Sequence, residues 1–165
     1  MPQDYARVIR SLDEHKVEFV IIGAMAAVSL GVPIATRDLD ICYRRSKQNI
    51  ALLVKALQPL HPKLRGAPAD LPFIFDAKTI ENGENFTFVT DVGDLDILGH
   101  ITGLSGYNEV IETAETLEIY GVRVKVMSLA TLIKAKKAAG RTKDKLQLLE
   151  IEAALRLRRE QAKDL

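Results

Sequence analysis

Tryptophan is absent from the sequence, and cysteine occurs once in 165 residues. Because Cys42 has no second cysteine to pair with, an internal disulfide is excluded, which agrees with a reducing compartment. The chain also lacks an apolar run of the roughly 20 residues that a membrane-spanning helix needs. Its first residues contain no basic stretch followed by an apolar one, so no signal peptide is predicted. We therefore expect a cytoplasmic protein with no membrane partner.

The sequence also has no large excess of either positive or negative charge. Lysine and arginine number 23, aspartate and glutamate 22, and the formal net charge is +1. Such a weak overall field does not attract nucleic acid by itself, so RNA binding would need a local basic patch. The hydrophobic content of 47% is ample for one core at this length. We expect a single domain over residues 1–165.

Helical and strand patterns both occur, which predicts an α/β (α+β) fold. Apolar residues at helical spacing predict helices over residues 4–16, 24–30, 47–60, 107–114, 129–139 and 142–160. Short apolar runs bounded by turn residues predict strands over residues 19–22, 36–41, 73–75, 85–90, 93–99, 117–120 and 122–126. Prolines and a glycine mark residues 61–72 as a surface loop. On the last helix, the apolar stripe expected to pack against the body is Leu146, Leu149, Ala153 and Leu157.

The most informative stretch is a buried strand, residues 19–22, followed by Gly23 and then by Asp38-Leu-Asp40. Side chains alternate faces along a strand, so the two aspartates point the same way. A glycine between a strand and a helix lets the backbone approach a ligand closely, and free N–H groups at a helix N-terminus attract anions. An Asp-x-Asp pair alone is a weak signal, because surface acids often flank strands.

A third acid comes from Gly93–Gly99, which repeats the pattern. If this strand pairs beside the first, either Asp94 or Asp96 joins the aspartate pair. Asp96 is preferred because it stands between Leu95 and Ile97 and is therefore expected nearer the centre of the sheet. Carboxylate oxygens are good ligands for Mg²⁺, and clusters of this kind serve in-line displacement at phosphorus. The three acids thus predict a metal site for phosphoryl chemistry.

With Gly23, Asp38, Asp40 and Asp96, the sequence resembles the DNA polymerase beta-like nucleotidyltransferase superfamily. The resemblance is to its small bacterial branch in particular, which includes toxins of toxin–antitoxin pairs. It implies a nucleotidyltransferase fold with a mixed, twisted sheet of about five or six strands flanked by helices. Residues 128–160 would form a C-terminal helical pair packed on the same domain.

The resemblance also implies an activity. Asp38 and Asp40 would ligate Mg²⁺ or Mn²⁺, and Asp96 would be the third ligand and the acid that acts on the attacking hydroxyl. A nucleoside triphosphate such as ATP would give its nucleoside monophosphate to the acceptor and release pyrophosphate. The acceptor would be a hydroxyl of RNA, particularly a tRNA 3′ end, or of a protein. A cognate antitoxin protein is the partner that this branch implies.

Six residues are expected to contact the nucleotide or its phosphates: Gly23, Ala24, Arg37, Lys136, Arg141 and Lys143. The family pattern has glycine or serine where this chain has Ala24, so one phosphate contact is missing. Arg37 falls on the opposite strand face from the aspartates, and a structural ion pair explains it equally well. The basic stretch from Lys134 to Lys145 is either a solvated helix face or a contact for triphosphate or RNA.

Two other functions remain open. Asp-x-Asp also holds the metal of many sugar-nucleotide glycosyltransferases, but those domains are usually longer and Asp96 would have no role there. A catalytically degenerate module of the same fold, which binds a nucleotide or a partner without turnover, is compatible with Ala24 and with the near-neutral charge. His100 could touch a phosphate, although a partly buried histidine without chemistry is the favoured interpretation.

Overall fold

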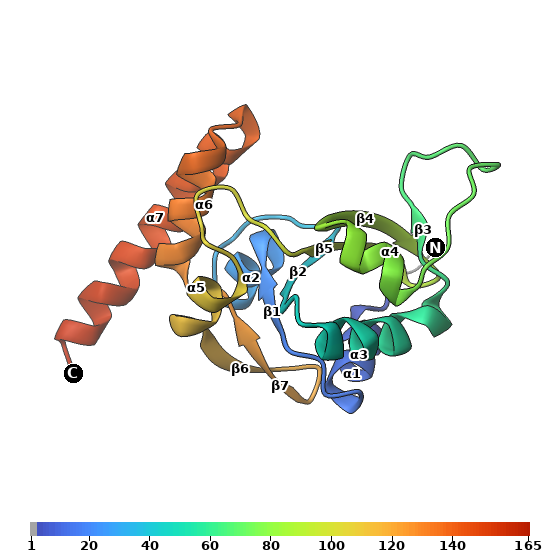
Figure 1. Ribbon diagram of the computed structural model, residues 1–165. Coiled ribbons are helices and arrows are strands. Elements are labelled where there is room, and N and C mark those ends of the chain that lie inside the picture. Colours follow the sequence, from blue (N-terminus) through green and yellow to red (C-terminus); the bar gives the residue numbers. More distant parts are fainter. Residues whose placement is uncertain (1–2) are drawn as a thin grey trace.

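The computed structural model describes residues 3–165 (Figure 1). The helices in this range are α1 (Tyr5–Glu14), α2 (Gly23–Ser29), α3 (Lys47–Leu57), the short 3-10 helix η1 (Gln58–Leu60), α4 (Ala77–Asn82), α5 (Tyr107–Glu112), α6 (Leu129–Ala139) and α7 (Thr142–Lys163). The strands are β1 (Phe19–Ile22), β2 (Leu39–Tyr43), β3 (Lys63–Leu64), β4 (Asn85–Thr90), β5 (Gly93–Leu98), β6 (Glu115–Ile119) and β7 (Val122–Val126). No helix among these is both long and apolar enough to cross a bilayer.

The strands form a mixed seven-stranded sheet in the order β3-β4-β5-β2-β1-β7-β6. β2 runs antiparallel to β1 and parallel to β5, and β1 runs parallel to β7. The predicted mixed sheet and helical C-terminus are confirmed, with seven strands where the resemblance implied about five or six. β5 lies directly beside β2 although α3, α4 and β4 separate the two in the chain. This pairing is what the convergence of the three acids requires.

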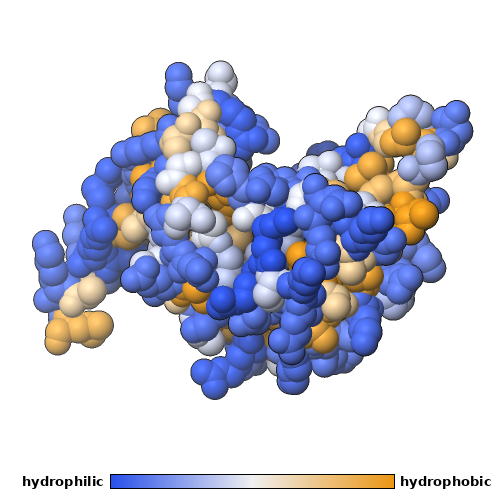
Figure 2. Space-filling model, in the orientation of Figure 1, coloured by the Kyte–Doolittle hydropathy of each residue, from blue (hydrophilic) through white to orange (hydrophobic). Residues whose placement is uncertain are grey.

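Asp40 and Asp96 each stand between two fully buried residues, Leu39 and Ile41 on β2 and Leu95 and Ile97 on β5. Because side chains alternate along a strand, the aspartates between them point to the opposite face of the sheet. Figure 1 shows α1 and α3 beneath the sheet, while the α6–α7 pair and the segment after β3 extend from the molecule on either side of the central strands. Figure 2 shows the surface hollowed between these two extensions. The acids therefore lie on the side of the sheet that faces this hollow.

The ends of several helices follow from local sequence. Ser46 and Ser128 accept hydrogen bonds from the backbone N–H groups of Asn49 and Thr131, both at 3.2 Å, and so cap α3 and α6. Gly140, with φ of +63°, ends α6 in the left-handed conformation that glycine adopts without strain. The helix predicted over residues 129–139 is confirmed as α6, with the same first and last residues.

The region between α3 and β4 differs from the prediction. Residues 73–75 form no strand, and part of the predicted loop 61–72 forms β3, which pairs antiparallel with β4 at the edge of the sheet. The rings of Phe73 and Phe75 lie 6.0 Å and 5.5 Å from that of Phe88. Their apolar side chains therefore pack against the sheet instead of extending it, which a strand propensity alone does not distinguish.

The apolar stripe predicted for α7 is also wrong. Leu146, Leu149 and Leu157 are 71%, 68% and 56% exposed, whereas Asp144 and Ile151 are fully buried. The helix turns a carboxylate inward because that carboxylate is paired with basic side chains before and at the start of α7. Hydropathy places an aspartate outside, so the pattern assigned the wrong face.

Candidate active site

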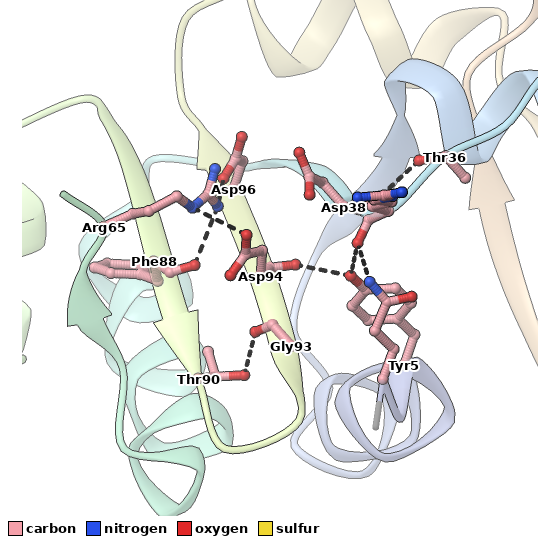
Figure 3. A network of polar contacts seen from close by, with 11 residues as sticks. Tyr5, Thr36, Asp38, Arg65, Phe88, Thr90, Gly93, Asp94 and Asp96 are labelled. Carbon is pink, nitrogen blue, oxygen red and sulfur yellow. Dashed lines mark hydrogen bonds and ion pairs between the residues drawn. The ribbon is translucent and has the colours of Figure 1, made fainter. Parts of the chain in front are cut away.

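Asp40 on β2 and Asp96 on β5 are directly paired neighbours in the sheet. Their carboxyl groups are close enough for the charge of Asp96 to raise the pKa of Asp40. Asp38 stands one residue before β2, and Figure 3 shows its carboxylate on the same side of the sheet as that of Asp96. Asp94 lies two residues nearer the start of β5, beside Val89 of β4. The structure thus places Asp96, and not Asp94, next to Asp40.

Negative charge is concentrated at this point. Burial, together with the carboxylates of Asp96 and Asp38, raises the pKa of Asp40 to about 7, while Arg65 opposes the rise. Burial also raises the pKa of Asp96, against the hydrogen bond and charge of Arg65. A raised carboxyl pKa means that the ionised form is destabilised where it stands. A cation bound between the acids would remove that destabilisation.

Gly23 fits the glycine turn expected from the sequence and also contacts an acid. Its φ of +65° lies in the left-handed region, which favours glycine. A Cβ at this position would collide with Oδ2 of Asp40. Glycine therefore permits both the turn after β1 and the position of the Asp40 carboxylate. Ala24 follows in α2, where its methyl group offers no hydrogen bond to a phosphate.

Arg65 is a member of this site that the sequence did not reveal. It follows β3, and its Nη2 donates hydrogen bonds to Asp96 Oδ1 and, at 3.1 Å, to the carbonyl oxygen of Phe88. Its Nε lies 3.4 Å from Asp94 Oδ2 (Figure 3). Within a stretch that reads as loop, an arginine gives no signal of where it reaches, because the target acids are on another strand.

The segment before β2 is fixed by α1. The hydroxyl of Tyr5 donates to the carbonyl oxygen of Arg37 and, at 3.2 Å, to that of Asp94, and Figure 3 shows both contacts. Burial, followed by the charge of Asp38, raises the pKa of Tyr5 to about 12. The side chain of Arg37 is exposed and makes no ion pair within residues 3–165, so its backbone is what the site holds in place.

A cavity of about 400 Å³ opens between the acids and the C-terminal helices. Gly23 and Asp40 line it from the sheet, His100 from the segment after β5, and Lys136 and Arg141 from the C-terminal part. Its size falls within the range of small-ligand sites. Asp40 and three of the predicted phosphate-binding residues, Gly23, Lys136 and Arg141, therefore border one space.

The two basic residues are anchored by a buried acid. Lys136 Nζ lies 3.0 Å from Asp144 Oδ1, and Arg141 Nε lies 2.7 Å from Asp144 Oδ2. Lys136 also donates to Gln147 Oε1 at 2.9 Å. Two cations share one carboxylate, so this cluster keeps a positive surplus. Lys143 is exposed and is not among the residues that line the cavity, so the structure does not bring it to the acids.

A divalent cation fits the donor chemistry of the acids but not their present arrangement. In the part of the chain described, no three histidine, cysteine, aspartate or glutamate side chains are gathered closely enough to hold a metal ion. The available donors are nonetheless hard oxygens in negative surplus, the type that Mg²⁺ and Mn²⁺ take. Asp38, Asp40 and Asp96 are the residues that would hold the ion.

No family model and no curated protein sequence matches this chain. Solved structures do. The lincosamide antibiotic adenylyltransferase LnuA, with lincomycin bound, superposes with a TM-score of 0.61 at 10% identity, over 93% of this chain and 99% of LnuA. A protein of Thermotoga maritima classed as a nucleotidyltransferase gives 0.53 at 18% identity, over 96% of this chain and 93% of that one. The antibiotic-resistance factor ANT(2'')-Ia gives 0.54 at 14% identity, over 97% of this chain and 93% of the other.

The chain therefore has the nucleotidyltransferase superfamily fold that its glycine turn and aspartates indicated. At these identities the likeness concerns the fold. Which reaction the chain performs has to be argued from its own residues.

Proposed function

We propose that this protein is a metal-dependent nucleotidyltransferase, which moves a nucleoside monophosphate from a nucleoside triphosphate to an acceptor hydroxyl. The observation that carries the proposal is the cavity with Gly23 and Asp40 on one side and Lys136 and Arg141 on the other. The acid side of this cavity has a surplus of negative charge, and the side with Lys136 and Arg141 has a surplus of positive charge. The space between them is of the size that holds a small ligand. A triphosphate with its divalent cation complements both.

In the proposed reaction the acceptor oxygen forms a bond to the α-phosphorus, and the bond from that phosphorus to the bridging oxygen breaks, so that pyrophosphate leaves. Lys136 and Arg141 would hold the phosphates, and Asp38 and Asp40 the metal. Asp96 would take the proton of the acceptor hydroxyl, directly or through its metal. A bound Mg²⁺ or Mn²⁺ would supply charge stabilisation for the attacking and leaving oxygens.

Three acceptor classes are open to this site. The resemblance to small bacterial toxins favours RNA, particularly a tRNA 3′ end, or a protein hydroxyl, with a cognate antitoxin as a further partner. The names of two structural neighbours add small hydroxylated antibiotics, since one is a lincosamide adenylyltransferase and another an antibiotic-resistance factor. All three share the hydroxyl nucleophile, so the catalytic residues are the same for each.

A degenerate module that binds a nucleotide or a partner without turnover is the second candidate. Two observations favour it. The side chain of Ala24 cannot hydrogen-bond a phosphate, and Asp96 is engaged by Arg65. The adjacency of Asp40 and Asp96 in the sheet supports the enzyme instead, because a binding module has no need of paired, partly buried acids.

The test is incubation with each α-labelled nucleoside triphosphate and Mg²⁺, in the presence of total bacterial RNA, of bacterial protein, or of a panel of hydroxylated antibiotics. We expect label on one acceptor class, and a loss of at least about 10³-fold when Asp38→Asn and Asp40→Asn are combined. Asp70→Asn, an exposed loop acid, is the control and should transfer normally. Equal transfer by the double variant and the wild type would remove the proposed mechanism. Nucleotide binding without transfer would favour the degenerate module.

A further inference from the structure

Arg65 reaches its acid across an entire strand. Its backbone N–H donates to the Thr87 carbonyl at 2.9 Å, and Thr87 pairs with Asp96, which pairs with Asp40. These four residues form one row from the edge of the sheet to its centre. Neighbouring strands are about 4.8 Å apart, so an extended arginine side chain can pass over a residue as small as threonine to an acid two strands away.

The guanidinium of Arg65 contacts two acids, but its hydrogen-bond donors are not all paired with them. Nη2 is shared between Asp96 Oδ1 and the carbonyl of Phe88, and Nε lies 3.4 Å from Asp94 Oδ2. Nε is buried and has no hydrogen-bond acceptor in good geometry. Leaving a buried donor unpaired is unfavourable. A shift of the guanidinium towards Asp94 would give this unpaired donor an acceptor.

Asp96 is also one of the three acids proposed to hold the metal. Asp40 stands beside it, yet the acids described here do not form a ready cation site. An Asp96 oxygen that accepts from Arg65 is not free for a metal ion.

We propose that Arg65 is the counter-ion that positions Asp96 when no metal is bound, and that a divalent cation at Asp38, Asp40 and Asp96 displaces its guanidinium towards Asp94. Arg65 then sets how tightly the site takes its metal. The inference rests on the proposed function only through the metal site, not through the nucleotide or the acceptor.

Two variants separate direct exchange from a general effect of charge. Arg65→Ala removes the contact and one positive charge. Thr87→Leu keeps every charge but puts a larger side chain in the path of Arg65. Lys63→Ala is the matched control, because Lys63 carries the same charge two residues before Arg65, is exposed, and pairs with Val89 two residues from Thr87.

The experiment is a titration of the full chain with Mn²⁺ alone, free Mn²⁺ being followed by electron paramagnetic resonance. Exchange predicts that Arg65→Ala and Thr87→Leu both bind Mn²⁺ about tenfold more tightly than the wild type, the loss of one competing charge-assisted contact. Lys63→Ala should change the affinity by less than about twofold, since an exposed charge out of contact is screened. Circular dichroism confirms that each variant is folded.

The outcomes distinguish this inference from the proposed function. If the wild type binds Mn²⁺ through Asp40, but Arg65→Ala binds no more tightly than Lys63→Ala or Thr87→Leu equals the wild type, exchange is overturned and the metal site stands. If both variants bind more tightly and no acceptor is ever labelled, exchange stands and the proposed function falls. Absence of Mn²⁺ binding in every variant overturns the exchange and the metal requirement together.

Discussion

Two ionic clusters face the same cavity, and they are built in opposite ways. On the sheet, the carboxylates of Asp38, Asp40 and Asp96 have one guanidinium in contact, that of Arg65. On the C-terminal helices, one buried carboxylate is shared by two cations. The first cluster is left short of positive charge and the second short of negative charge.

The pKa shifts show what this difference means. In the helical cluster, hydrogen bonds from Arg141 and Lys136 outweigh the effect of burial and lower the pKa of Asp144. In the sheet cluster, burial and like charges raise the pKa of Asp40. A carboxyl group whose pKa is lowered is stabilised in its ionised form by the folded protein. A carboxyl group whose pKa is raised is destabilised when ionised, and a bound cation would offset that destabilisation. The helical cluster is therefore expected to govern stability and the sheet cluster to govern binding.

The largest effect on stability is expected from Asp144→Ala. It leaves the ammonium of Lys136, whose side chain is 10% exposed, with Gln147 as its hydrogen-bond partner. Breaking a buried pair from one side costs about 3 kcal/mol, and urea unfolding should show that loss in the free energy of unfolding. Adding Lys136→Met to the same chain should restore most of it, because no buried charge then remains. Equal stability of wild type and single variant would mean that the cluster is not structural.

Gly23→Ala is expected to come next. The left-handed φ and the collision of the new Cβ with Asp40 Oδ2 together should cost about 2 kcal/mol of the free energy of unfolding. Since the methyl group moves the Asp40 carboxylate, nucleotidyl transfer should fall by much more than stability does. Gly31→Ala is the control: its φ is +90°, but a Cβ there has no neighbour within 4 Å. If both variants lose activity equally, the contact between Gly23 and Asp40 has no functional weight.

The pH dependence separates the clusters further. Asp40 has a pKa of about 7 in the folded protein against 3.8 as the ordinary value, so the folded state holds a proton that the unfolded chain releases between those pH values. The contribution of Asp40 to the free energy of unfolding therefore falls as pH rises from about 4 to about 7. With EDTA present, Asp40→Asn should be about 1 to 2 kcal/mol more stable than the wild type at pH 8 and no more stable at pH 4.

Thermal unfolding at the two pH values checks this prediction, with Asp70→Asn as a control that should show no such difference. The sign is the informative part. A variant that is less stable than the wild type at pH 8 would mean that the ionised acid is well compensated, and the contrast with the helical cluster would then disappear.

Features of this molecule were predictable from the sequence where a local pattern specifies them, and not where they depend on contacts between distant segments. The central strands, Gly23, Asp40 and Asp96 were predictable because alternation and a turn glycine are local patterns, and the motif repeats on β5. Arg65 was not, since its role depends on the pairing of β3 with β4 and of β4 with β5, and no local pattern encodes that order. The roles of these residues in chemistry stay predictions.

The face of α7 failed for a related reason. Burial of an aspartate is favourable only when its partners are known, and Lys136 and Arg141 lie on a helix and a turn that had to be placed first. The three exposed leucines are together more hydrophobic than the buried pair Asp144 and Ile151. The periodic pattern therefore assigned the exposed face of α7 to the core.

The smallest expected effect tests which face of α7 is buried. Leu149 is 68% exposed, so Leu149→Gln should change the free energy of unfolding by less than about 0.5 kcal/mol. Ile151 is fully buried two residues further on, and Ile151→Ala should lose about 2 kcal/mol or more by leaving a cavity. Urea unfolding of the two variants side by side gives the comparison. The reverse order would place the leucine stripe against the body of the protein and turn Asp144 away from Lys136. The helical cluster would then not exist, and the positive side of the cavity would lose its anchor.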